Sequence, residues 1–265
     1  MQTLFAIRLS SGPAASPPST PELRRPPMRS GLAGHALFLD IDGTLLDLAP
    51  APELVEVPAW MVPLLERLAL KLDGAVAFVS GRTIAAIDAL FAPLKLPAIG
   101  VHGGEMRLHE QVVADESLVA ELQSALPMMQ AAIERVPAAR LENKRCAIAL
   151  HYRNAPERGR EVLELAELAV ARLGPAFALL VGKCVVEIRP RHLTKGAALR
   201  RLMEQAPFRG RSPIFAGDDV TDEDAFEVVN QVGGISVRVG AAAPSAATYR
   251  LASPDQLRRW LLDIA

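Results

Sequence analysis

The sequence predicts an α/β protein in which a doubly wound, parallel, Rossmann-like sheet is interrupted by a smaller inserted α+β domain. Two observations predict this fold. Short apolar runs that read as buried strands alternate with helical segments in the early and late parts of the chain. Between these parts the order changes to helix, strands, helix, strands, which is typical of an antiparallel sheet. Half of the residues are hydrophobic, which is enough for a buried core without disulfides.

Two parts of the chain have the alternation expected of the core. In the first, HALFLDI, GAVAFVS and AIGVHGG read as buried strands, with helices expected over 59–72 and 83–91. In the second, SPIFAGD and ISVRVG read as strands among helices over 194–206, 221–231 and 254–265. Strands and helices that alternate in this way form a parallel sheet with helices on both faces.

The part between them is expected to combine helices with an antiparallel sheet. Residues 116–135 are helical, and Pro127 should kink or divide them. LENKRCAIALHYR reads as one or two strands, and the helix over 156–174 ends at its glycine. FALLVGKCVVEIRP reads as a hairpin that turns at Gly182 and Lys183.

The domain boundaries follow from these changes of pattern. We expect the core to comprise residues 35–105 and 191–265, with the inserted domain over 106–190. Residues 1–34 form an extension dominated by Pro, Ser and Arg. Because such a composition buries little apolar surface, we expect this extension to be disordered.

Composition excludes several classes of protein. The chain has 29 basic and 30 acidic residues, and its net charge of −1 argues against a polybasic nucleic-acid or membrane-surface binder. No apolar run is long enough to span a membrane, and the N-terminus lacks the pattern of a signal peptide. Cys146 and Cys184 lack metal-ligand spacing and read as small buried hydrophobes. We expect a cytoplasmic monomer whose partner is a small molecule, not a nucleic acid or a membrane.

The strongest chemical signal is the pair Asp40 and Asp42 in FLDIDGT, at the end of the first expected strand. In an extended chain, residues two positions apart point to the same side, so both carboxylates can face one point beyond the strand. Open α/β sheets bind their ligands at this edge. Two anions so close persist best with a cation between them or with one of them protonated.

Three further motifs occur at the ends of expected elements. Ser80 closes the second strand in FVSGR, and Lys195 lies in the first turn of a helix that Thr194 or a neighbour would cap. The acidic run GDDVTDED follows a buried strand, and its Asp218 comes directly after that strand, as Asp40 does after its own. Carboxylate ligands with no His or Cys nearby favour Mg²⁺ over zinc.

These four motifs, in this order, resemble those of the haloacid dehalogenase superfamily. The resemblance implies a phosphatase in which Asp40 attacks phosphorus, forming an aspartyl-phosphate, and Asp42 is the general acid/base. Ser80 and Lys195 would stabilise the phosphoryl group. Mg²⁺ would be held by Asp40, Asp218 and the backbone carbonyl of Asp42. Residues expected to support this site are Arg82, Asp219 and Asp222.

Within that superfamily, residues 35–265 resemble the trehalose-6-phosphate phosphatase family. The resemblance rests on FLDIDGTL, SGR, HGGE, LENK, HYR, GKCVVEIRP, TKG and GDDVTDED, which occur in the family's order. It implies that the inserted domain is a cap that closes over the core and grips the sugar. We expect His151 and Tyr152 to pack or to orient Arg153, without a part in the chemistry. Residues that would bind the substrate are His102, Gly103, Glu105, Glu142, Lys144, Arg153, Lys183 and Glu187.

Two alternatives remain open. The same chemistry could act on another sugar phosphate, of the sucrose phosphate or mannosyl-phosphoglycerate type, and the charged residues of the cap would decide between them. A protein of a different class, a non-catalytic sugar-phosphate sensor, would be expected to have lost Asp40 or Asp42. Both residues are present in this chain.

Overall fold

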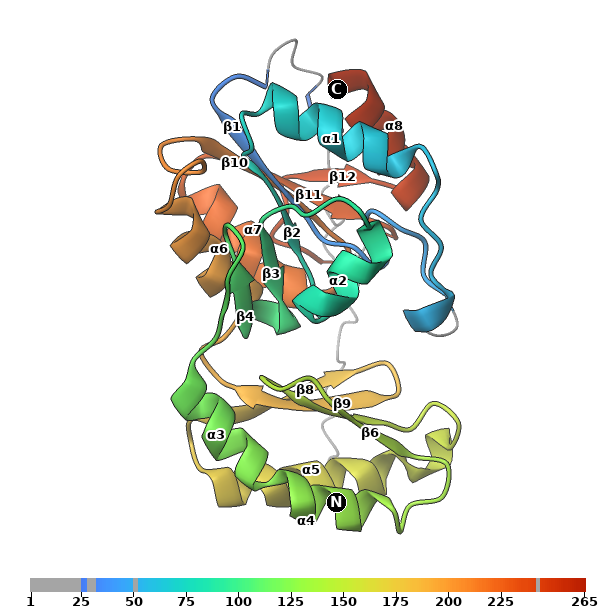
Figure 1. Ribbon diagram of the computed structural model, residues 1–265. Helices are drawn as coiled ribbons and strands as arrows, with labels where there is room; N and C mark the ends of the chain where they lie inside the picture. The colour runs from blue at the N-terminus through green and yellow to red at the C-terminus, as the bar shows by residue number, and fades with distance from the viewer. Residues whose placement is uncertain (1–24, 28–31, 50–51, 242–243) are drawn as a thin grey trace, which may run out of the picture.

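The computed structural model describes residues 25–27, 32–49, 52–241 and 244–265. The described chain forms two domains, which are stacked one above the other and joined by two segments (Figure 1). Most of the proline-rich extension, whose disorder the sequence predicts, lies outside the described residues. Leu32, near its end, is buried in the hydrophobic core of the larger domain.

The larger domain is built on an eight-stranded sheet; its strands are β1 (His35–Leu39), β2 (Val76–Val79), β3 (Ala98–Gly100), β4 (Glu105–Arg107), β5 (Val112–Val113), β10 (Ser212–Gly217), β11 (Ile235–Val239) and β12 (Tyr249–Leu251). Their order is β12-β11-β10-β1-β2-β3-β4-β5. The strands from β12 to β3 are parallel, and β4 and β5 continue the sheet in antiparallel fashion. β1 and β10 pair along their whole length in the middle of the sheet, so their carboxyl ends meet at one edge.

The helices of the larger domain are α1 (Met61–Lys71), α2 (Ile84–Phe91), α6 (Lys195–Met203), α7 (Glu223–Gln231) and α8 (Pro254–Ile264). α1 and α8 lie side by side on one face of the sheet, where Lys71 Nζ donates a hydrogen bond to the Ile264 carbonyl at 2.9 Å (Figure 1). α6 and α7 pack together on the other face. The predicted doubly wound sheet is therefore confirmed. The predicted cap of α6 is also confirmed, because the Thr194 hydroxyl accepts a hydrogen bond from the Ala197 N–H.

The smaller domain, which we call the cap, combines a four-stranded antiparallel sheet with three helices; its elements are α3 (Glu116–Ser124), α4 (Leu126–Ile133), β6 (Arg140–Asn143), β7 (Ile148–His151), α5 (Gly159–Leu173), β8 (Phe177–Gly182) and β9 (Val185–Pro190). The strand order is β6-β7-β9-β8. Pro127 lies in the first turn of α4, so the predicted helical stretch is divided as expected. Ile148, Leu150, Val186 and Ile188 belong to the apolar core between this sheet and the helices.

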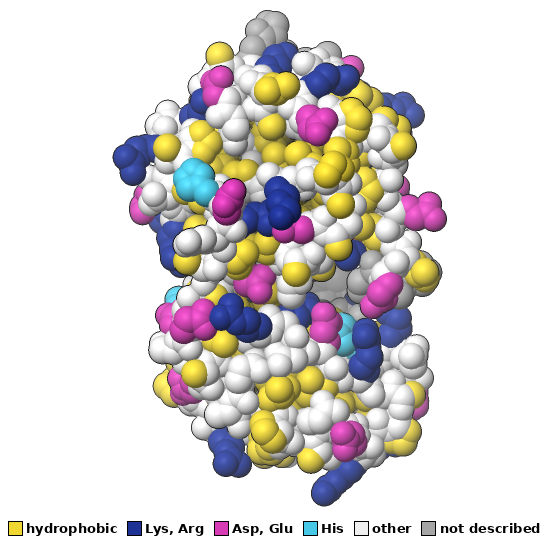
Figure 2. Space-filling view, in the orientation of Figure 1, with side chains coloured by type: hydrophobic (Ala, Val, Ile, Leu, Met, Phe, Trp, Pro, Cys, Tyr) yellow, Lys and Arg dark blue, Asp and Glu magenta, His cyan; other side chains and the backbone are white. Residues whose placement is uncertain are grey.

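The opposite face of the cap sheet is turned toward the larger domain (Figure 1). Strand residues alternate between the two faces, so the residues between the packed apolar ones lie on this open face. Glu142, Ala149 and Glu187 form one row across three strands because they are paired in register. His151 and Val185 form the neighbouring row on the same face. Charged and histidine side chains accordingly gather where the two domains meet (Figure 2).

Three strands without a predicted counterpart have only two or three residues each: β4, β5 and β12. β4 and β5 carry the larger sheet beyond residue 106, where the inserted domain was expected to begin. The predicted strand AIGVHGG is shorter than expected, because β3 ends at Gly100 and the chain turns, with Val101 and His102 at positive φ of 48° and 53°. None of the helices in the described part of the chain combines the length and apolar character needed to cross a membrane.

Candidate active site

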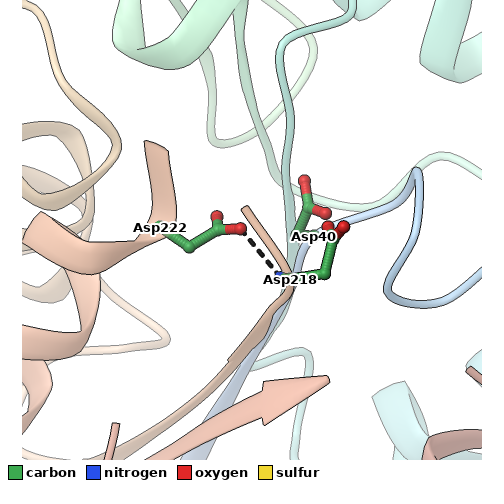
Figure 3. Close-up of side chains that lie close together, drawn as sticks. All are labelled: Asp40, Asp218 and Asp222. Atoms are coloured by element: carbon green, nitrogen blue, oxygen red, sulfur yellow. Dashed lines mark hydrogen bonds between the residues drawn. The ribbon is translucent and has the colours of Figure 1, made fainter. Parts of the chain in front are cut away.

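Asp40 and Asp218 lie side by side at the carboxyl edge of the larger sheet. Asp40 directly follows β1 and Asp218 directly follows β10, and the Asp40 N–H donates to the Ala216 carbonyl at 3.0 Å. Asp222, at the end of the short helical turn η4 (Val220–Asp222), joins them. One carboxylate oxygen of each aspartate lies within 4.8 Å of the other two (Figure 3). Two aspartates that the sequence analysis assigned to separate strand ends are thus neighbours in space.

Asp222 is fully buried in this cluster, although the sequence analysis gave it only a supporting place. Its Oδ2 accepts hydrogen bonds from the backbone N–H groups of Asp218 at 3.0 Å and Asp219 at 2.9 Å. A Cβ on Gly217 would lie only 2.4 Å from Asp222 Cγ, so the glycine leaves room for this carboxylate. No helical spacing signals this contact, because Asp218 lies before η4 and meets Asp222 through its backbone N–H.

Lys195 balances part of this negative charge. It begins α6, is 3% exposed, and its Nζ donates to Asp40 Oδ1 at 2.8 Å and to Asp222 Oδ1 at 2.7 Å. Burial alone would lower the pKa of Lys195, but the charges of Asp222 and Asp40 outweigh burial and raise it, so the side chain is a cation. Burial raises the pKa of Asp40 well above its usual range. Burial and the charge of Asp222 raise the pKa of Asp218 to about 6.

This donor set fits a divalent cation. The cluster offers carboxylate oxygens without His or Cys, which are the ligands that Mg²⁺ prefers. A bound cation would favour the ionised forms of Asp40 and Asp218, and so oppose the burial and the acidic neighbours that raise their pKa values. Neighbouring groups fix Asp218, since Thr44 Oγ1 donates to its Oδ1 at 3.1 Å. A Cβ on Gly43 would lie 2.2 Å from Asp218 Oδ2, so only glycine permits the loop after β1 to approach this closely.

The carboxylate of Asp42 lies outside the cluster, contrary to the expectation that it faces the same point as Asp40. The physical reason is that β1 ends at Leu39 and the chain turns at Ile41, so that Asp42 forms only an isolated bridge with Leu46 and the alternation of an extended strand does not apply. Both Asp42 oxygens accept hydrogen bonds from Arg82, from Nε and Nη2, each at 2.7 Å. This hydrogen bonding raises the pKa of Arg82. The Arg82 N–H in turn donates to Ser80 Oγ at 3.2 Å, so Ser80, Arg82 and Asp42 form one connected chain.

His102 lies between the larger domain and the cap. Its Nε2 is 3.5 Å from Glu187 Oε2 of the cap. A Cβ on Gly81 would lie 2.4 Å from the same nitrogen, so the imidazole packs directly on the Gly81 backbone. Burial, followed by the positive charges of Lys195 and Lys144, keeps the pKa of His102 well below its usual range. The ring is therefore neutral at pH 7.

Gly103 and Glu105, which are close in sequence, contact the N-terminal ends of two helices of the larger domain. A Cβ on Gly103 would lie 2.6 Å from the Thr194 carbonyl oxygen, so this glycine lets the loop pack against the start of α6. Glu105 is buried and accepts a hydrogen bond from the Ile84 N–H at 2.8 Å, at the N-terminus of α2. Glu105 was expected to bind substrate, and its carboxylate instead accepts a hydrogen bond from this helix.

The two cysteines differ in burial. Cys146 is buried as predicted, whereas Cys184 is only partly buried.

Glu142, Lys144 and Glu187 come together on the open face of the cap. Lys144 Nζ donates to Glu187 Oε1 at 2.5 Å and to the Gly81 carbonyl of the larger domain at 3.3 Å. Glu187 is 5% exposed, and its Oε2 has no hydrogen-bond partner among the described residues. Glu142 Oε2 lies 2.7 Å from His151 Nε2. The cap thus presents two carboxylates and an ammonium group toward the edge of the sheet that carries the acidic cluster.

The other predicted site residues, Arg153, Lys183 and Asp219, do not belong to the acidic cluster. Arg153, after β7, and Lys183, in the turn between β8 and β9, are exposed and form no hydrogen bond or ion pair with another described residue. Asp219 caps η4, where its Oδ1 accepts from the Val220 N–H at 2.7 Å. His151 was expected to pack or to orient Arg153, and its observed polar contact is Glu142.

Known proteins resemble this chain over most of its length. The model of the trehalose-phosphatase family matches residues 38–255. The chain is 42% identical over 234 residues to the trehalose-6-phosphate phosphatase of Escherichia coli K12, covering 86% of both. It is 43% identical over 232 residues to the probable trehalose-phosphate phosphatase of Sinorhizobium fredii, covering 87% of this chain and 88% of the relative. The crystal structure of a trehalose-6-phosphate phosphatase related protein superimposes with a TM-score of 0.70 at 26% identity, covering 86% and 96% of the two chains.

Fold, acidic cluster and relatives together define the class of this protein, which is a phosphoric monoester hydrolase. Within that class, the chain belongs to the trehalose-phosphatase family. The resemblance drawn from the sequence motifs is therefore confirmed. It extends through the cap as well as the core, because the matched residues 38–255 include every helix and strand of the cap and most of those of the core.

Proposed function

We propose that this chain is a Mg²⁺-dependent phosphatase that hydrolyses trehalose 6-phosphate to trehalose and phosphate through an aspartyl-phosphate at Asp40. One observation carries the proposal: the Asp40 carboxylate is buried among Asp218, Asp222 and Lys195, at the edge of the sheet that the charged face of the cap covers. Relatives of more than 40% identity are named as phosphatases of this substrate.

In this mechanism Asp40 is the nucleophile. Its carboxylate oxygen forms a bond to phosphorus while the bond from phosphorus to the sugar oxygen breaks. Lys195, which already touches Asp40, would hold the equatorial phosphoryl oxygens, together with Ser80 at the end of β2. Asp40 and Asp218, with Asp222 close by, would hold Mg²⁺, which would neutralise part of the negative charge on the phosphoryl group. The aspartyl-phosphate is then hydrolysed by water.

Asp42 would move the protons. It would give a proton to the leaving sugar oxygen and later take one from the attacking water. Both of its oxygens accept hydrogen bonds from Arg82, an arrangement that supports the second, proton-accepting half of this role. The link from Arg82 to Ser80 Oγ ties the position of Asp42 to the end of β2.

The cap would recognise the sugar. A disaccharide offers many hydroxyl groups, and the open face of the cap offers the carboxylates of Glu142 and Glu187 and the ammonium group of Lys144. Glu187 Oε2 is buried and accepts no hydrogen bond from the described residues, its nearest polar contact being His102 Nε2 at 3.5 Å; this favours a ligand hydroxyl there, because an unsatisfied buried carboxylate oxygen is costly. Such remote contacts orient the phosphate group and help the cap to close.

The direct test is release of inorganic phosphate from a panel of substrates with and without Mg²⁺. The panel contains trehalose 6-phosphate, sucrose 6-phosphate, glucose 6-phosphate and a mannosyl-phosphoglycerate. We expect the highest kcat/KM for trehalose 6-phosphate, and loss of turnover when Mg²⁺ is removed by EDTA. A higher kcat/KM for another member of the panel would overturn the substrate, and full activity after removal of the metal would overturn the mechanism.

A further inference from the structure

His151 and Glu142 form a contact on the open face of the cap that the proposed chemistry does not use. His151 ends β7, and its Nε2 lies 2.7 Å from Oε2 of Glu142 on the neighbouring strand β6. The register pairs His151 with Arg140 and Glu142 with Ala149, so the two side chains meet diagonally across the strands. Both are partly buried, with 24% and 39% of their side chains exposed.

This contact holds Glu142 in its charged form. The hydrogen bond from His151 is the main cause that lowers the pKa of Glu142, and the positive charges of Lys144 and Arg140 act in the same direction. Because the carboxylate is ionised and can only accept, His151 Nε2 must donate the hydrogen bond. Among the described residues, the Glu142 carboxylate has no other hydrogen-bond partner, so one of its oxygens is held and the other is available.

Without His151, the carboxylate would have other cations to turn to. Lys144 and Arg140 are close enough to act on its charge, and Lys144 already bridges Glu187 and the larger domain. A Glu142 drawn toward Lys144 would compete with Glu187 for the same ammonium group. The diagonal hydrogen bond therefore keeps the carboxylate of Glu142 away from that of Glu187, so that each can contact a ligand independently.

We propose that His151 is a positioning residue for sugar recognition: it holds one oxygen of Glu142 so that the other can accept a hydrogen bond from a sugar hydroxyl. This inference rests on the proposed function and deepens it. His151 acts through Glu142 and does not touch the reacting phosphoryl group. Its loss thus affects a substrate with a sugar far more than one without.

The experiment compares trehalose 6-phosphate with p-nitrophenyl phosphate, which has no sugar, in the full-length Mg²⁺-loaded enzyme. For His151→Ala we expect kcat/KM for trehalose 6-phosphate to fall roughly ten-fold, chiefly through a higher KM, because a charge-assisted hydrogen bond is misplaced. The loss on p-nitrophenyl phosphate is expected to be much smaller. His151→Gln should recover most of the loss, because its amide nitrogen lies as many bonds from the backbone as Nε2 and can donate. The exposed His109, changed to Ala, is the matched control and should leave both substrates unaffected.

A double-mutant cycle then tests whether His151 acts through Glu142. In a Glu142→Gln background, His151→Ala should cost little more, since the carboxylate that it positions is gone. If His151→Ala does not fold, as judged by its melting temperature, His151→Phe replaces it, because Phe keeps the ring but lacks the donor. Equal losses on both substrates, no recovery with Gln, or an undiminished effect in the Glu142→Gln background would overturn the inference. Wild-type enzyme that cleaves p-nitrophenyl phosphate but not trehalose 6-phosphate would instead overturn the proposed function, and with it this inference.

Discussion

The ammonium group of Lys195 donates a hydrogen bond to Asp40 at 2.8 Å across 155 residues of sequence. The whole cap lies between these two residues in the chain, yet both are buried at the same edge of one sheet. Asp40 follows β1, and Lys195 begins the helix that leads into β10, the neighbour of β1. The acidic cluster and its lysine therefore come together only when the two parts of the core have paired, and the cap is inserted in the chain between those two parts.

Replacing Asp40 with Asn should abolish turnover while the fold persists. The amide is a poor nucleophile and a weaker ligand, so we expect kcat for trehalose 6-phosphate to fall by at least about 1,000-fold. Without metal, the melting temperature should be unchanged or higher, because burial and the charges of Asp222 and Asp218 make the ionised Asp40 unfavourable. Phosphate release and thermal melts measure the two effects. A variant that keeps a tenth of the wild-type rate would contradict the assignment of Asp40 as nucleophile.

Stabilisation of the fold by Mg²⁺ should increase with pH. In the metal-free protein the pKa of Asp218 is about 6, against an ordinary value of 3.8. Between these values the folded chain binds more protons than the unfolded chain, so stability falls as pH rises through this window and the loss is complete above about 6. The raised pKa of Asp40 acts in the same direction. Mg²⁺ binds the ionised carboxylates and reverses the loss. The rise in melting temperature on adding Mg²⁺ should thus be larger at pH 7.5 than at pH 5, and an equal rise at both would count against this metal site.

Loss of Lys144 or Glu187 should separate substrate recognition from chemistry. In Lys144→Ala and Glu187→Ala we expect kcat/KM for trehalose 6-phosphate to fall about ten- to a hundred-fold, as one charge-assisted hydrogen bond is removed. The decrease for p-nitrophenyl phosphate should be far smaller, since the acidic cluster and Lys195 are untouched. Lys95→Ala, at an exposed lysine of the larger domain, is the control. An equal decrease in kcat/KM for both substrates would show that these residues stabilise the fold and do not bind the sugar.

Gly81 should not tolerate a side chain. The Cβ of Gly81→Ala would lie 2.4 Å from His102 Nε2, and the buried imidazole has little room to move. We expect a destabilisation of about 1–3 kcal/mol, measured as the free energy of unfolding in urea. The double variant with His102→Ala removes the obstructing ring, so it should be less destabilised than the sum of the two single variants. Additive losses would show that the close approach of these two residues does not limit the packing here.

Much of the fold and of the acidic centre could be predicted from the sequence because the signals are local. A buried apolar run that ends in Asp, as at Asp40 and Asp218, gives both a strand and the edge where its carboxylate lies. The direction of the Asp42 side chain could not be predicted in this way, since it depends on a turn and on Arg82, which is 40 residues away in the sequence. The contact of His151 with Glu142 was likewise hidden, because it depends on the register of β6 and β7, which neither strand specifies alone.

The most direct measurement of the central claim is the fate of the phosphoryl group in a single turnover. Enzyme in excess over trehalose 6-phosphate is mixed with Mg²⁺ and quenched in acid within milliseconds, and its peptides are examined by mass spectrometry. The proposed mechanism predicts a phosphoryl group on Asp40, formed as trehalose is released and lost as inorganic phosphate appears. The Asp40→Asn variant should carry none. A phosphoryl group on a different residue, or trehalose 6-phosphate that remains intact while another sugar phosphate is consumed, would contradict the account.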